Sequence, residues 1–114
     1  DLPPLKIIGP EQNQLLVLCW GSAFGASLSA VESLQQKGKE VSLLHLQCLY
    51  PFHEELGNVL SGFDKILIPE MNLGQLSVLI RSDFLVDAVS MKKVQGKPFM
   101  VSEIRERIES LLQG

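Results

Sequence analysis

The sequence predicts an α/β domain in which helices cover both faces of a mostly parallel β-sheet, a three-layer sandwich. Apolar runs without alternation recur along the chain, which is typical of strands that are buried on both faces. Segments whose apolar residues have helical spacing separate these runs, and this alternation favours parallel crossover units and a sheet of four or five strands. The chain has 114 residues, which fits a single domain spanning residues 1–114.

The first part of the chain predicts a lead-in followed by a strand–helix–strand unit. Residues 1–14 form the lead-in, in which we expect a short edge strand at residues 5–8. The strand should end there because Pro10 of the following Gly9-Pro10 pair has no N–H to donate to a ladder. Residues 15–20 are the expected central strand, and residues 40–46 the next one. The helix between them has Ser22 as its expected N-cap, Gly38 as its stop, and an apolar face of Phe24, Leu28, Val31 and Leu34.

The second part predicts two more strands and three helices. We expect strands at residues 65–69 and 86–91, which are rich in branched apolar side chains. The final helix has Ser102 as its expected N-cap and Glu103 in its electropositive first turn. Helical spacing predicts three buried stripes: Leu56, Val59, Leu60 and Phe63; Leu76, Leu79, Ile80 and Phe84; and Ile104, Ile108, Leu111 and Leu112.

Composition and charge argue against several classes of protein. The formal net charge is −3 and the basic residues are scattered, so the sequence offers no stripe for nucleic-acid phosphates. No apolar stretch reaches the roughly 18 residues that span a bilayer, and no signal peptide is evident. The cysteines, Cys19 and Cys48, fit no metal or cluster spacing and are expected to be reduced thiols. We therefore expect a soluble, cytoplasmic protein without nucleic-acid or membrane partners.

The turn at residues 21–26 is a candidate ligand site. It joins a predicted strand to a helix N-terminus, where free backbone N–H groups and the helix dipole favour an anion. The turn lacks the spacing of the dinucleotide fingerprint and of the P-loop. The alternative is structural: Gly21 and Gly25 would allow a tight turn and close packing of the helix on the sheet.

A second candidate is the polar segment at residues 69–76, where Glu70, Asn72, Gly74 and Gln75 follow a predicted strand. Loops at strand ends carry sites in open α/β sheets. The alternative is a capping-box variant in which Asn72 caps the next helix and Gln75 reaches back to it. Glu70 is left unexplained by that cap, and is expected to be solvated or to contact a ligand or another subunit.

No metal site or catalytic set is predicted. His45, Cys48 and His53 lie close in sequence, but nothing fixes a fourth metal ligand. Two histidines and many carboxylates permit some triad arrangement in almost any sequence, and only geometry identifies a real one. The residues alone thus indicate a domain that works within a larger assembly.

Four motifs in order resemble the last domain of 2-oxoacid:ferredoxin oxidoreductase alpha subunits. They are LVLCWGS at residues 16–22, LQCLYPF at 46–52, PEMNLGQL at 69–76 and KVQGKPF at 93–99. The resemblance covers roughly residues 15–110, and the third and fourth motifs look closer to 2-oxoglutarate-type enzymes than to pyruvate-type ones.

The resemblance implies a transketolase C-terminal-domain-like fold with a mostly parallel five-stranded sheet, forming the C-terminal domain of an alpha subunit. It implies a complex that oxidatively decarboxylates a 2-oxoacid, 2-oxoglutarate for this type, to acyl-CoA and passes the electrons to ferredoxin. The cofactors that it implies for the whole complex are thiamine diphosphate, Mg²⁺, an iron–sulfur cluster and coenzyme A. Its partners would be the beta subunit and the rest of the alpha subunit. For this domain it implies a structural and interface role, with no catalytic, cofactor-binding or metal residue. The motif positions expected at an interface or ligand surface are Gly21, Ser22, Pro51, Phe52, Glu70, Asn72, Gly74 and Gln75.

Two other interpretations remain open at the level of sequence. One is a free-standing flavodoxin-like binding or regulatory module, which would hold a phosphate at the turn of residues 21–26. The other is a natural small subunit of an oxidoreductase whose remaining domains are encoded separately.

Overall fold

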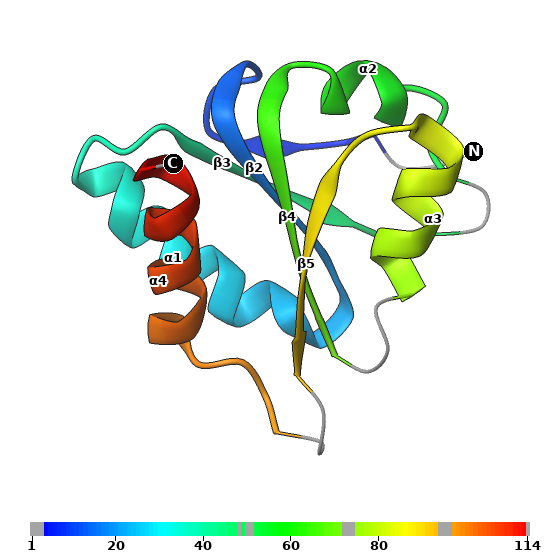
Figure 1. The fold of residues 1–114 in the computed structure, drawn as a ribbon. Coiled ribbons are helices and arrows are strands. Elements are labelled where there is room, and N and C mark those ends of the chain that lie inside the picture. Colours follow the sequence, from blue (N-terminus) through cyan, green and yellow to red (C-terminus); the bar gives the residue numbers. More distant parts are fainter. Residues whose placement is uncertain (1–3, 48, 50–51, 72–74, 94–96, 114) are drawn as a thin grey trace.

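A computed structural model of the chain describes residues 4–47, 49, 52–71, 75–93 and 97–113 (Figure 1). Its sheet has five strands in the order β1-β3-β2-β4-β5. Strand β1 pairs antiparallel with β3, and the other pairings are parallel, so the expected mostly parallel five-stranded sheet is confirmed. The strands are β1 (Ile7–Ile8), β2 (Asn13–Trp20), β3 (Val41–Leu46), β4 (Phe63–Met71) and β5 (Ala88–Lys93).

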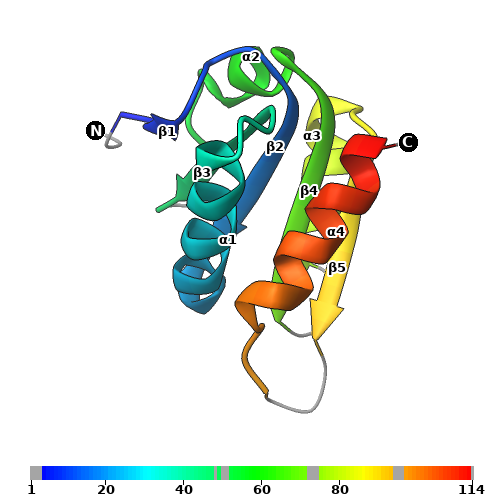
Figure 2. The ribbon, with the colours of Figure 1, turned by 90° about the vertical axis from the view of Figure 1, so that its left-hand side faces the viewer.

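Helices cover both faces of the sheet, which confirms the three-layer prediction. Figure 2 shows α1 and α4 side by side on one face, while α2 and α3 pack on the other. The helical elements are the 3₁₀ turn η1 (Gly21–Ala23), α1 (Phe24–Gln36), α2 (Leu56–Leu60), α3 (Gln75–Phe84) and α4 (Val101–Gln113). Among the described residues, no helix is long and apolar enough to cross a membrane.

The central strand β2 contributes to two separate cores. Leu15, Val17 and Cys19 pack toward α1 and α4, whereas Leu16 and Leu18 pack toward α2 and α3. All five side chains have no exposed surface. Each large apolar side chain buried in this way contributes about 1.5–3 kcal/mol. This double burial is the physical reason why the run lacks the alternation of a half-buried strand.

The predicted cap of the first helix is wrong, while its predicted stop is confirmed. Residues Gly21–Ala23 form a 3₁₀ turn, so α1 begins at Phe24 with Ala23 as its N-cap and without a side-chain cap hydrogen bond. Ser22 is exposed within that turn, one position before the cap. At the other end, Gly38 follows the last turn with a φ of +79°, a left-handed conformation that glycine adopts without steric cost.

Two other helix ends differ from the expectation. Helix α4 begins at Val101, so Ser102 lies inside its first turn, and the Glu103 carboxylate accepts a 2.8 Å hydrogen bond from the Met100 N–H instead. Phe63 belongs to β4 and not to the helix before it, because α2 ends at Leu60 with Ser61 as its C-cap. The Gly62 carbonyl then accepts a 3.1 Å hydrogen bond from the Asn13 N–H. This bond aligns the start of β4 with β2.

Candidate functional site

The parallel strands end at one edge of the sheet, which we call the carboxyl edge: the ends of β2, β3, β4 and β5 and the segments that follow them. Helix α1 follows β2 on one face, and α3 follows the neighbouring strand β4 on the other face (Figure 1). The crossover connections therefore leave these two parallel strands in opposite directions, β2 toward β3 and β4 toward β5, so the topology switches between β2 and β4. In open α/β sheets, ligands bind outside the strand ends at such a switch point.

Gly21 and Ser22 lie at this switch point, directly after β2, and both are exposed. Gly21 has a φ of +64°, so a left-handed backbone requires glycine there. A Cβ added at Gly21 or Gly25 would meet nothing within 4 Å apart from the immediate backbone, so close packing of the helix on the sheet does not explain these glycines. The tight turn therefore accounts for glycine at position 21, and the space beside the Gly21 Cα is open.

Two exposed apolar side chains at the carboxyl edge were not singled out from the sequence. Trp20, the last residue of β2, is 40% exposed, and Met100, directly before α4, is 63% exposed. Isolated exposed apolar residues are common, but tryptophan is enriched at the centres of protein interfaces. The sequence carried this signal only in part, because Trp20 ends an apolar run that predicts burial.

Glu70 occupies a different environment from the one expected. Its side chain is 3% exposed, near the carboxyl end of β4. One carboxylate oxygen accepts the N–H of Leu76 at 2.8 Å, and the other accepts the N–H of Ser77 at 3.0 Å. The expectation of a solvated carboxylate is therefore wrong: Glu70 satisfies the backbone donors of the first turn of α3 and complements its dipole.

The remaining predicted positions are only partly placed. Phe52 is half-buried and packs at a tilt against Phe84 of α3, with ring centroids 5.7 Å apart. Gln75 is the first residue of α3. Pro51, Asn72 and Gly74 lie outside the described residues, as does the cap predicted at Asn72.

The titratable groups of the central strands show no sign of a redox or metal site. Burial raises the pKa of the Cys19 thiol to about 12, an effect that the neighbouring Ser27 hydroxyl only partly offsets. His45 stacks on Phe24 with ring centroids 4.2 Å apart, and its burial lowers its pKa. Within the part of the chain that the structure describes, no group of three His, Cys, Asp or Glu residues could hold a metal ion.

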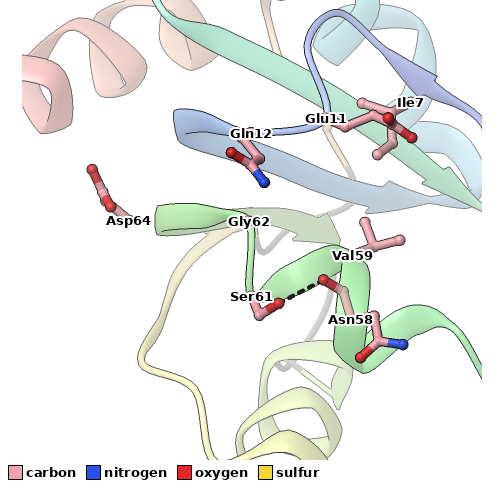
Figure 3. Close-up of a pocket in the computed structure, with 8 residues that line it drawn as sticks. All are labelled: Ile7, Glu11, Gln12, Asn58, Val59, Ser61, Gly62 and Asp64. Carbon is pink, nitrogen blue, oxygen red and sulfur yellow. Dashed lines mark hydrogen bonds between the residues drawn. The ribbon is translucent and has the colours of Figure 1, made fainter.

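A hollow of about 520 Å³ lies at the opposite, amino edge of the sheet (Figure 3). The turn before β2 and the α2–β4 connection form it, and its polar lining includes the carboxylates of Glu11 and Asp64. Ser61 donates a 2.7 Å hydrogen bond to the Asn58 carbonyl at its rim. None of the predicted site residues lines this hollow, and its lining offers no preorganised set of donors.

Comparison with known proteins gives matches over nearly the whole chain. The profile of the family "Pyruvate:ferredoxin oxidoreductase core domain II" matches residues 14–104. The Mycobacterium tuberculosis protein named 2-oxoglutarate oxidoreductase subunit KorA is 38% identical over 114 residues, which cover 99% of this chain and 18% of that protein. An alpha subunit of a 2-oxoacid:ferredoxin oxidoreductase from Saccharolobus solfataricus is 27% identical over 96% of this chain and 18% of its own length. The chain thus spans about a fifth of the length of these relatives.

Solved structures share the fold. A 2-oxoglutarate:ferredoxin oxidoreductase from Magnetococcus marinus matches 98% of this chain and 20% of its own, with a TM-score of 0.92 and 24% identity. A split-gene transketolase matches 96% of this chain and 41% of its own, with a TM-score of 0.72 and 11% identity. The alpha chain of a probable 2-oxoacid ferredoxin oxidoreductase from Thermoplasma acidophilum matches 96% of this chain and 97% of its own, with a TM-score of 0.65 and 26% identity.

Proposed function

Because the chain belongs to the pyruvate:ferredoxin oxidoreductase core domain II family, we propose that it serves as a domain of the alpha subunit of a 2-oxoglutarate-type 2-oxoacid:ferredoxin oxidoreductase. The observation that carries this proposal is the family match over residues 14–104, together with 38% identity to a 2-oxoglutarate oxidoreductase subunit across the chain. The complex would convert 2-oxoglutarate and coenzyme A into an acyl-CoA and carbon dioxide while reducing ferredoxin.

The domain's own contribution would be structural. An iron–sulfur cluster needs thiolate ligands, whereas the Cys19 thiol is buried and its pKa is raised to about 12. The described residues also include no metal-binding group. They therefore do not fit the cluster or Mg²⁺, and other parts of the complex would hold both groups and thiamine diphosphate.

The carboxyl edge is the surface that we assign to contact with the rest of the enzyme. Exposed Trp20 and Met100 offer apolar area there, and the exposed Gly21-Ser22 turn allows close backbone approach. Glu70 supports this surface indirectly, because it fixes the start of α3 at the same edge.

A pair of matched variants tests this assignment in the assembled enzyme. Ser22→Glu adds a carboxylate at the carboxyl edge, while Ser110→Glu adds one at an exposed position near the far end of α4. We expect Ser22→Glu to weaken recovery of partner subunits at least tenfold and Ser110→Glu to leave it unchanged, because a buried unpaired charge at an interface costs several kcal/mol. Equal recovery with both variants would remove the carboxyl edge from the proposal.

The reaction is tested on the purified complex that contains the full subunit. We expect ferredoxin reduction that requires both 2-oxoglutarate and coenzyme A, with a higher kcat/KM for 2-oxoglutarate than for pyruvate. A preference for pyruvate would overturn the 2-oxoglutarate assignment and retain the family, whereas no reduction with any 2-oxoacid would overturn the proposed reaction.

A further inference from the structure

Strand β5 forms one edge of the sheet. It pairs with β4 on one side, and in the part of the chain that the structure describes no strand lies on its other side (Figure 1). An edge strand presents unpaired backbone N–H and C=O groups, to which an extended segment of another molecule can add. β5 has six residues and none of them is proline, so its length and composition allow such pairing.

The hydrogen bonds of the central strands determine which backbone groups face this free edge. In a parallel pair, one of two partner residues bonds to both chain neighbours of the other, and that other residue therefore faces away. The Leu15 N–H donates a 3.3 Å hydrogen bond to the Glu40 carbonyl, so Leu15 faces β3 and the next residue, Leu16, faces β4. Leu16 is the partner of Ile66. Ile66 therefore faces away from β2, toward β5.

Arg81 of α3 occupies the first acceptor of the free edge. Ile66 is the partner of Ala88, so the N–H and C=O groups of Ala88 point away from β4. The direction alternates along a strand, and the backbone groups of Ser90 and Lys92 therefore point the same way. The Nε and Nη2 groups of Arg81 donate hydrogen bonds of 3.1 Å and 2.7 Å to the Ala88 carbonyl. This carbonyl is thus already bonded within the chain.

We propose that Arg81 prevents β5 from pairing with the β5 strand of a second copy of this protein. Two identical edge strands can pair antiparallel about a two-fold axis, and an axis at Ser90 sets Ala88 of each copy opposite Lys92 of the other. In that arrangement the Ala88 carbonyl must accept the Lys92 N–H of the second copy. The Arg81 guanidinium occupies this acceptor, and the exposed Lys92 side chain adds charge to the edge. The inference concerns the chain itself and does not depend on the proposed reaction.

Analytical ultracentrifugation of the purified full-length protein tests this role over a range of concentrations. Arg81→Ala frees the Ala88 carbonyl, and Lys39→Ala removes an exposed positive charge from the turn before β3 as a matched control. We expect the Arg81→Ala protein to double in mass as its concentration rises, while wild type and Lys39→Ala keep a constant mass. A constant mass for Arg81→Ala, or the same doubling for Lys39→Ala, would overturn the proposal.

A second substitution shows whether this association uses the β5 edge. Ser90→Pro removes an N–H that faces the free edge and leaves the hydrogen bonds to β4 intact. The Arg81→Ala/Ser90→Pro protein should therefore return to the wild-type mass. Association that persists in the double variant would arise from another surface or from unfolding, and it would contradict the proposed role of Arg81.

Residue-resolved amide hydrogen exchange of the wild-type protein tests the free edge without any substitution. The N–H groups of Ser90 and Lys92 should exchange at least tenfold faster than those of Val89 and Met91, because the latter two bond to β4. Equal protection of all four amides would show that the edge is already covered in the wild-type protein, and the proposal would then fail.

Discussion

The backbone N–H of Leu76 donates a 2.8 Å hydrogen bond to the carboxylate of Glu70, across the connection between β4 and α3. The second carboxylate oxygen accepts the N–H of Ser77, so one buried side chain satisfies two donors of a helix start. This arrangement ties the end of a central strand to the helix that covers it, at the edge where the candidate site lies.

Replacing Glu70 should destabilise the fold. We expect Glu70→Ala to lower the free energy of unfolding by about 1–3 kcal/mol, because two buried backbone donors lose a charged acceptor. Glu70→Gln should fall between wild type and alanine, since its amide oxygen is a single, neutral acceptor. Urea denaturation measures both, with Glu54→Ala at an exposed position as the control. A Glu70→Ala value within about 0.5 kcal/mol of that control would refute the capping role.

Two glycines should respond to alanine in opposite directions. Gly9 has a φ of +115°, and a Cβ there would lie 2.6 Å from Nε2 of Gln35, which bridges the carbonyls of Ile8 and Val41. We expect Gly9→Ala to cost about 1–3 kcal/mol. Gly25 lies in the first turn of α1 with open space around it, and Gly25→Ala should stabilise the fold by up to about 1 kcal/mol. Thermal unfolding compares them, and the same sign for both would contradict the described geometry.

The buried thiol of Cys19 should make stability fall at high pH. Its pKa rises from 9.0 to about 12 on burial, so between these values the unfolded chain releases a proton that the folded chain retains. The free energy of unfolding then decreases as pH rises through this window, by up to about 1.4 kcal/mol per pH unit, and this contribution is fully present below pH 9. Cys19→Ala should have a shallower slope between about pH 9 and 10.5 in urea titrations. Identical slopes would show that the thiol is solvated.

Lys65 should anchor the end of α4. Its Nζ donates a 2.5 Å hydrogen bond to the Leu111 carbonyl in the last turn of that helix. Lys65→Met retains most of the aliphatic stem and removes the donor, so we expect a loss of about 1 kcal/mol and faster amide exchange in the last turn of α4. Lys37→Met, at an exposed position after α1, is the control. Unchanged exchange at the end of α4 would contradict the anchor.

The architecture could be predicted from the sequence because it depends on local patterns. The apolar run of β2 lacks alternation since both of its faces are buried, and the stripe that includes Ile104 and Ile108 follows the helical period. The residue type alone likewise predicted Gly38 as the end of the first helix, because glycine adopts the left-handed conformation found there.

The helix starts and the role of Glu70 could not be predicted in the same way. Ser22 and Ser102 are of a residue type that favours N-caps, but a 3₁₀ turn and the Glu103 carboxylate determine where the two helices begin. Glu70 bonds to residues six and seven positions ahead, a separation outside the short capping patterns that sequence analysis uses. The left-handed Leu85 carries no sequence signal, because leucine is not typical of that conformation.

The central claim is tested most directly by capturing the affinity-tagged protein from an extract of its native cells and identifying the bound chains by mass spectrometry. The account predicts recovery of a thiamine-binding beta subunit, at an abundance close to that of the tagged protein. A tagged protein recovered alone, or with partners unrelated to 2-oxoacid oxidation, would contradict the proposed place of this domain in the enzyme.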